Sequence, residues 1–323
     1  MEVNFRTLKD NACNSVSRSG RDGTKLIFIH TGAVLLFSLL STVIHYLLDQ
    51  QIVSTGGLSG MGTRAVLETI QSLLETGQTI LLPFWQMGYT YTILQMARGR
   101  NFGTGSLLEG FRRFGPVFRL NLIQTLIYSA LAMACSYGAA FLFALTPFAD
   151  PLKEAIMPFL SAGGEMDTEA VANAIMGAME QVQIPVLALF FVVFLPFFLP
   201  LWYSYRQAGF WLMDHPGHGA LISLQASKAL MRGHRMELFQ LDASLLWFHG
   251  LDLLVSAVLY GGFFLSVLGI QLPWTTTATS FLFLAVYCLC QLGLYVWRRN
   301  QVECTYANYY DAILPPPPPE QEM

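Results

Sequence analysis

The sequence predicts an all-α fold, a polytopic membrane helix bundle with six transmembrane helices and short amphipathic helices at the membrane interface. Three observations predict this fold. Charged residues make up 12% of the 323 positions, about half of the roughly 25% that soluble domains carry. Six stretches hold the roughly 20 apolar residues that a helix needs to cross the hydrocarbon core. The segments between these stretches alternate in their number of Lys and Arg residues, a pattern typical of membrane proteins.

The predicted spans form one membrane domain between two terminal segments. Residues 1–25 form the N-terminal segment, and residues 298–323 form a tail with a Pro-rich end. The first span is longer than the apolar core of a signal peptide and no small-residue cleavage site follows it, so we expect it to remain in the mature protein. The six spans of the domain 26–297 cover residues 26–48, 76–97, 120–145, 184–205, 243–270 and 276–297.

The charge of the segments outside the spans predicts the orientation of the chain. From the N-terminus to the C-terminus these segments carry 5, 1, 5, 1, 4, 0 and 2 Lys and Arg residues. Cytoplasmic loops are the ones enriched in Lys and Arg. The alternation therefore predicts a multi-pass protein of the cell membrane whose N-terminus and C-terminus are both cytoplasmic. A missed or additional span would break the alternation, so the counts also favour six spans.

Amphipathic segments in the loops predict short helices that lie on the membrane surface. On the outer side, apolar residues repeat at helical spacing over 66–74 and after Asp167, and a substrate-capturing outer domain is the alternative. On the cytoplasmic side, a helix is predicted to follow a cap at Asp214 and to end at Gly233. Basic residues in this helix and in the preceding cytoplasmic loop are candidate contacts for anionic lipid, namely Lys228, Arg232, Arg235, Arg112 and Arg113.

Six of the polar residues inside the predicted spans are candidates for function, each a few residues from a cytoplasmic span end. We expect them to share one layer in the inner leaflet. Ionisable groups within a membrane are costly and are functional candidates, although a polar layer can also serve only to hold helices together. The six candidates are His30, Asn121, Gln124, His249, Asp252 and Gln291.

Motifs for catalysis, nucleotide binding or metal binding do not rise above background. His215 and His218 have no Cys or carboxylate beside them to complete a tetrahedral site, so we expect no metal and no cofactor. The five cysteines give no disulfide framework. A net charge of −3 gives no reason to expect a nucleic-acid partner.

Three segments resemble an uncharacterised bacterial membrane family, catalogued as domain of unknown function nine-seven-five. Residues 227–235 form a basic stretch, residues 238–244 lead into a span that continues through Trp247, and residues 305–310 form a Tyr-rich ending. The resemblance implies a bacterial cytoplasmic membrane protein, and it brings no known reaction with it.

These observations favour a non-enzymatic protein, an accessory, scaffolding or lipid-interacting factor. Its expected partners are membrane lipids with anionic headgroups on the inner leaflet, and the sequence points to no particular protein partner. The alternative is a small transporter or permease that uses the inner-leaflet polar layer as part of its path. An intramembrane enzyme would need a convergent nucleophile and base, which the sequence does not assemble.

Overall fold

A computed structural model describes residues 4–54, 61–161, 168–260 and 276–315 of the chain. The described residues form helices joined by turns, with no strand among them, so the predicted all-α class is confirmed. The chain divides into two compact units. The first comprises Met1–Leu120 and Arg206–Met323, and the second comprises Asn121–Tyr205.

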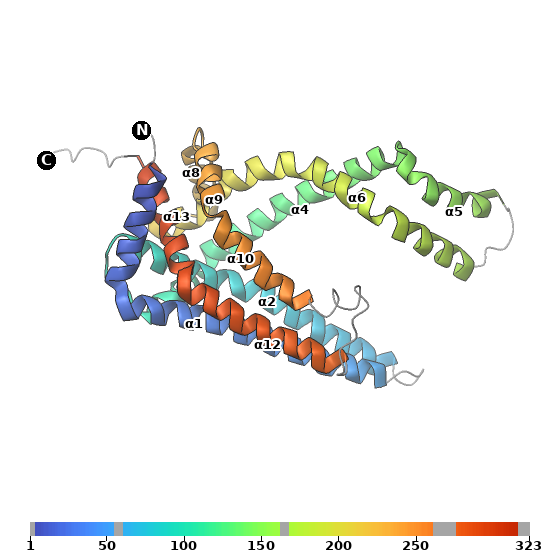
Figure 1. Ribbon diagram of the computed structural model, residues 1–323, viewed down its shortest axis with the longest axis horizontal. Coiled ribbons are helices and arrows are strands. Elements are labelled where there is room, and N and C mark those ends of the chain that lie inside the picture. The colour runs from blue at the N-terminus through green and yellow to red at the C-terminus, as the bar shows by residue number, and fades with distance from the viewer. Residues whose placement is uncertain (1–3, 55–60, 162–167, 261–275, 316–323) are drawn as a thin grey trace. The chain divides into compact units, whose positions relative to one another are not determined.

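Helices from both ends of the chain build the first unit. In Figure 1, α1 and α12 run side by side, with α2 packed against α1 and with α13 continuing the direction of α12. The side chain of Asn308 donates to the carbonyl of Leu8 at 3.2 Å, which joins the two ends of the chain. The helices of this unit are α1 (Phe5–Ser54), α2 (Met61–Ala97), η2 (Thr104–Leu108), α3 (Glu109–Arg112), α7 (Ala208–Asp214), α8 (Ala220–Leu230), α9 (Arg235–Ser244), α10 (Leu246–Ala257), η4 (Val258–Tyr260), α12 (Thr276–Leu294), η5 (Tyr295–Arg299) and α13 (Asn300–Ile313), together with the first turns of α4 (Phe114–Ala144).

The segment between α2 and α4 packs directly on the backbone of α2 at two glycines. A Cβ atom on Gly88 would collide with the backbone of Leu107, and one on Gly110 would collide with the backbone carbonyl of Phe84. The side chain of Phe84 stacks on Phe114 with ring centroids 4.6 Å apart. Glycine is therefore required at both positions for η2 and α3 to lie directly on α2.

The second unit is a helical hairpin with a short helix at its tip. It contains most of α4, then η3 (Pro147–Ala149), α5 (Asp150–Ser161) and α6 (Thr168–Tyr205). One cluster of its buried apolar residues consists of Phe143, Ala149 and Val182, with Leu189 packed against them. Near the opposite end, Gln124 on α4 donates to the carbonyl of Tyr205 at 3.4 Å.

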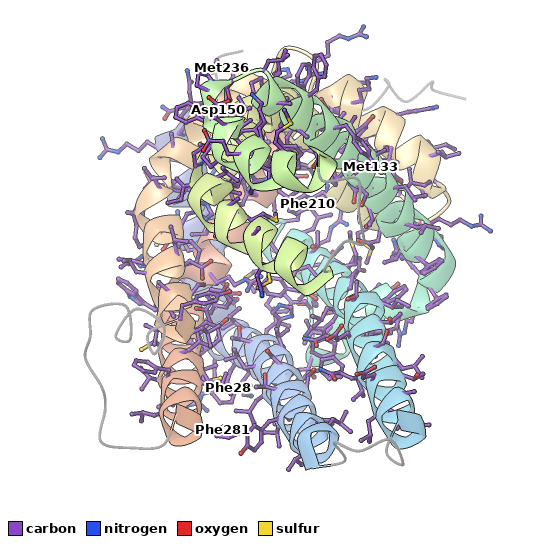
Figure 2. All side chains as sticks on the ribbon, turned by 90° about the vertical axis from the view of Figure 1, so that its right-hand side faces the viewer. Phe28, Met133, Asp150, Phe210, Met236 and Phe281 are labelled. Atoms are coloured by element: carbon purple, nitrogen blue, oxygen red, sulfur yellow. The ribbon has the colours of Figure 1, made fainter. Side chains whose placement is uncertain are left out.

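Four of the described helices are long and apolar enough to cross a membrane. They lie within Phe5–Leu48, Phe114–Ala144, Val182–Asp214 and Phe281–Ile313. A fifth arises if the pair Arg235–Ser244 and Leu246–Tyr260, bent by 63°, counts as one span. Apolar side chains project from these helices, including the exposed Phe28 and Met133 (Figure 2). Several long apolar helices of this kind suggest a membrane protein.

The predicted count of six spans is not confirmed. The stretch 76–97 is helical within α2, but Gln78, Gln86 and Gln95 interrupt its apolar sequence, and α2 is not among the four. The stretch 243–270 begins in α9 and α10, and its last ten residues, 261–270, lie outside the described residues. The other four predicted spans coincide with the four apolar helices.

The short surface helices differ in part from the prediction. The segments 66–74 and 168–182 are continuous with the long helices α2 and α6, so they are not separate helices. The predicted helix before Gly233 exists as α8, and Gly233 has the positive φ of a helix-ending turn, 93°. The predicted cap at Asp214 is wrong. Asp214 is the last residue of α7, and α8 begins six residues later with Gly219 as its N-cap.

Candidate functional site

The helix α13 collects the polar contacts of the first unit. Eight of its residues are buried, although five of these eight have polar or phenolic side chains. Helix α13 contacts both α1 and α2, and its polar groups bind partners on α1, α2, α7 and α9. We call the ion pairs and hydrogen bonds of this region the α13 cluster. Its principal members are Arg98, Arg206, Asp214, Asp242, Asn300, Tyr306, Tyr310 and Asp311.

Local backbone geometry at the end of α2 positions the first of these residues. The amide of Gly99 donates to the carbonyl of Met96 at 3.1 Å, and the amide of Arg100 donates to the carbonyl of Gln95 at 2.9 Å. Gly99 has φ 65°. This pair of bonds is a Schellman motif, which needs glycine at the residue after the C-cap. Arg98 is that C-cap, so its cation lies at the negative end of the α2 dipole.

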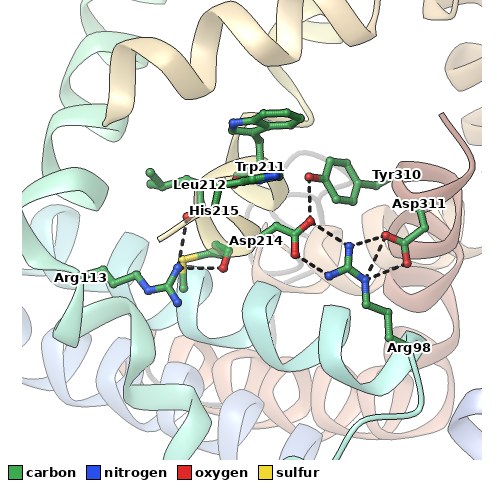
Figure 3. Close-up of polar contacts among 9 residues, drawn as sticks. Arg98, Arg113, Trp211, Leu212, Asp214, His215, Tyr310 and Asp311 are labelled. Carbon is green, nitrogen blue, oxygen red and sulfur yellow. Dashed lines mark hydrogen bonds and ion pairs between the residues drawn. The ribbon is translucent and has the colours of Figure 1, made fainter. Parts of the chain in front are cut away.

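Arg98 binds two carboxylates at once, as Figure 3 shows. Its Nη1 and Nη2 donate to the two oxygens of Asp214 at 2.5 and 2.9 Å. Its Nη2 and Nε donate to Asp311 at 2.6 and 3.1 Å. The hydroxyl of Tyr310 donates to Asp214 at 3.3 Å. Paired, two-pronged bonds of this kind are among the strongest that arginine makes, and here they join the ends of α2, α7 and α13.

The charges of this triad favour its ionised form. Burial favours the protonated form of Asp214, but the hydrogen bonds and the charge of Arg98 outweigh burial and lower the pKa of Asp214 below its usual value. The hydrogen bond to Asp214 raises the pKa of Arg98 above its usual value. The side chains are mostly buried, with 18% of Arg98 and 16% of Asp214 exposed. The ion pair is therefore a packed structural contact.

A second ion pair lies between α9 and the start of α7. Arg206 donates to Asp242 at 2.5 Å and stacks over the ring of Tyr306, 4.4 Å from its centroid. The hydroxyl of Tyr306 donates to Asp242 at 2.7 Å. His249 Nε2 lies 3.1 Å from the same hydroxyl oxygen. Because Tyr306 gives its proton to Asp242, we infer that His249 donates to Tyr306 through Nε2.

Further polar contacts lie where α12 meets α13. The hydroxyl of Tyr89 donates to Asn300 at 2.9 Å, and the amide of Asn300 donates to the carbonyl of Gly23 at 2.8 Å. Arg299 stacks over Tyr295, 4.2 Å from the ring centroid. Tyr295 and Arg299 lie in the π-helical turn η5 and Asn300 follows it, and such turns often mark functional positions.

Each of the six predicted polar residues lies in a described helix. Asp252 and Gln291 are the pair that the structure brings together, since Gln291 Nε2 donates to Asp252 Oδ1 at 2.7 Å. His30 stacks on Tyr89, with ring centroids 4.1 Å apart. His249 contacts Tyr306, as described above. Asn121 and Gln124 belong to the second unit.

The five basic candidates for lipid contact fall into two groups. Lys228 and Arg232 are exposed, and 71% of the Arg112 side chain is exposed. Arg235 is half-buried. Arg113 is mostly buried, and its Nη1 donates to the carbonyls of Leu212 and Met213 at 3.2 and 2.8 Å (Figure 3). Arg113 therefore serves to hold α7 against the turn that precedes α4.

Histidines near α7 pack against aromatic and acidic groups. His215 stacks on Trp211 with centroids 4.0 Å apart, and His234 Nδ1 lies 2.8 Å from Glu237. Within the described ranges, no group of three or more His, Cys, Asp or Glu residues is placed to hold a metal ion.

The α13 cluster could not be found by sequence reasoning about each segment alone. Arg98 and Asp311 are 213 residues apart, and Tyr306 and Asp242 are 64 residues apart. The one sequence feature that pointed to the α13 cluster was the Tyr-rich ending at residues 305–310, and it did so only as part of a family resemblance.

A family model described as "Protein of unknown function (DUF975)" matches residues 17–315. The chain belongs to this family. The match extends the resemblance noted in the basic segment to nearly the whole chain, so the DUF975 region covers most of the first unit, all of the second unit and the whole α13 cluster. No curated protein matches the chain, and no solved structure matches it.

Proposed function

We propose that this chain is a non-enzymatic protein of the cell membrane that binds anionic lipid on the inner leaflet. In this proposal both termini are cytoplasmic, and α8 is the lipid-contacting element. The transporter remains the alternative proposal. The main observation in support of lipid binding is the exposed face of α8.

The exposed face of α8 combines apolar and basic side chains. Leu221 is 63% exposed and Ile222 is 48% exposed. Lys228 is exposed two turns after Leu221 on the same side, and Arg232 is exposed in the turn that follows α8. The opposite face, which includes Leu224, is buried. A helix of this kind places its apolar side chains between lipid headgroups and its cations beside the phosphates. Each Lys or Arg near an anionic surface contributes about 1 kcal/mol.

An aromatic and basic group supports a membrane boundary near the end of α12. Trp297 is 61% exposed and Trp247 is 46% exposed, with ring centroids 6.2 Å apart. The guanidinium of Arg298 lies 4.7 Å from the Trp297 centroid. Tryptophan gathers at membrane interfaces, where its ring meets both apolar and polar surroundings.

The α13 cluster supports a scaffolding role more than a chemical one. Its charged side chains form ion pairs with one another. Arg98 pairs with both Asp214 and Asp311, and Arg206 pairs with Asp242. Such pairing holds the ends of α2, α7, α9 and α13 in fixed positions and thereby sets the place of α8, which follows α7 directly.

Lipid retention tests the proposal. The full chain is purified in mild detergent, and the bound lipids are identified by native mass spectrometry. Lys228→Gln with Arg232→Gln should reduce the bound phosphatidylglycerol or cardiolipin relative to the wild type. Lys153→Gln, which removes an exposed lysine from α5, is the control and should leave retention unchanged. Unchanged retention in the α8 double variant would contradict the proposal.

A further inference from the structure

A cleft lies between the N-terminal part of α1 and the loop that follows α2. Its volume is about 260 Å³. Two backbone breaks border it. Helix α1 is kinked at Gly20, where φ is 50°, and α2 ends in the Schellman motif at Gly99. The polar residues that line the cleft are Ser15, Arg18, Ser19, Asp22, Arg100 and Asn101.

The two arginines of the cleft differ from Arg98 and Arg206, which are paired with carboxylates. Arg18 and Arg100 are exposed, and no ion pair involves either one among the described residues. Arg98, two positions before Arg100, is held by two carboxylates. The single acidic residue of the lining, Asp22, has Lys25 as an ion-pair partner at 3.7 Å. The cleft therefore carries uncompensated positive charge.

The hydrogen-bonding groups of the cleft suit a phosphate oxygen. The hydroxyls of Ser15 and Ser19 donate to the carbonyls of Ala97 and Val16 at 3.3 and 2.7 Å, so their protons are already used. The remaining donors are the guanidinium groups of Arg18 and Arg100 and the amide of Asn101. Two planar guanidinium groups bind phosphate in a two-pronged manner and more strongly than neutral donors do.

The surroundings of the cleft favour a lipid as the source of the phosphate. A second cavity of about 310 Å³ shares Asn101 and Phe102 with the cleft and extends to the exposed Arg112. In the same turn, Leu108 is 49% exposed and Phe114 is 54% exposed. Exposed apolar side chains beside a basic cavity are the arrangement expected at a headgroup layer.

We propose that this cleft binds the phosphate of an anionic lipid headgroup, with Arg18 and Arg100 as its ligands. The site is separate from the exposed face of α8, but the inference rests on the proposed function because it assumes that this side of the protein meets the inner leaflet.

Titration of the detergent-purified full chain tests this site. The probes are dioctanoyl-phosphatidylglycerol, dioctanoyl-phosphatidylcholine and inorganic phosphate, and calorimetry measures their affinities. The wild type should bind the phosphatidylglycerol saturably and more tightly than the other two. Arg18→Gln with Arg100→Gln should weaken that binding by about tenfold or more, because charge-assisted hydrogen bonds are lost. Arg6→Gln with Arg21→Gln removes two exposed arginines of α1 that do not line the cleft, and this control should bind like the wild type.

Three other results of these titrations would overturn different parts of the inference. Equal affinity for inorganic phosphate and phosphatidylglycerol would overturn the lipid assignment in favour of a soluble phosphate compound. Wild-type binding by the Arg18 and Arg100 variant would overturn the site itself. Asn101→Asp, which keeps the size of the side chain and adds negative charge, should also weaken binding. This variant replaces the double variant in the test if the double variant does not fold. If only the Lys228 and Arg232 variant loses lipid, this inference fails while the proposed function stands.

Discussion

Arg98 and Asp214 are 116 residues apart and joined by two parallel hydrogen bonds of 2.5 and 2.9 Å. The pair connects the last residue of α7 to the C-cap of α2. Because Arg98 also binds Asp311, one guanidinium holds three helix ends together. The side chains are mostly buried, so the loss of the cation leaves two carboxylates without their partner.

Removal of that cation should destabilise the protein. We predict that Arg98→Gln costs about 3 kcal/mol, since breaking a buried pair from one side leaves an uncompensated charge. Arg98→Lys should recover only part of the loss, because lysine cannot span both carboxylates with a planar fork. Thermal unfolding in detergent measures both. Arg21→Gln, at an exposed position of α1, is the control and should leave the unfolding midpoint unchanged.

The same contact predicts a dependence of stability on acid. The pKa of Asp214 is lowered in the folded protein from its ordinary value of 3.8. Below that ordinary value the unfolded chain takes up a proton that the folded protein resists. The stabilisation from Asp214 should therefore be complete above about pH 4 and be lost as pH falls through the lowered pKa. Unfolding midpoints of the wild type and Asp214→Asn, measured between pH 5 and 2, should converge at the acid end. Parallel curves would contradict this.

Backbone packing against α2 gives a prediction independent of charge. Gly88→Ala should destabilise the protein by about 1–3 kcal/mol, the usual cost of overpacking, because the new methyl group meets the backbone of Leu107. Gly77→Ala, in the same helix with open space around it, is the matched control and should be neutral or stabilising, since alanine favours helix more than glycine does. Equal unfolding midpoints for the two variants would show that η2 does not lie on α2 in this way.

Substitutions at Asp252 and Gln291 distinguish a structural role of this pair from a functional one. Asp252→Asn keeps an oxygen that can accept from Gln291, so folding should be preserved. Asp252→Leu leaves the buried amide of Gln291 without its partner, which costs about 1–3 kcal/mol, and the double change to Leu at both positions should recover part of that cost. Expression yield and unfolding midpoint measure the series. A folded Asp252→Asn protein that fails to complement a deletion strain would favour the transport alternative.

Sequence reasoning predicted the helical class and four of the long apolar helices because span length and apolar content are local properties. It overestimated the apolar character of 76–97, where three glutamines lie among large apolar residues. It interpreted Asp214 as a helix cap because Pro216 follows in what would be the first turn, whereas the distant Arg98 determines its contacts. The contact between Asp252 and Gln291 joins two residues that we expected in one inner-leaflet layer, although the sequence did not identify them as a pair. The α13 cluster depends on packing between distant segments, which periodicity does not report.

Side-chain accessibility in intact cells tests the central claim, that α8 and its basic residues face the cytoplasm, most directly. In a variant without the five native cysteines, Lys153→Cys on α5 and Arg232→Cys after α8 are treated with a membrane-impermeant maleimide. Both positions are exposed in the structure, so burial does not limit labelling. We predict that the Lys153→Cys protein is labelled in intact cells and that the Arg232→Cys protein is labelled only after the membrane is opened. Labelling of the Arg232→Cys protein in intact cells would contradict the account.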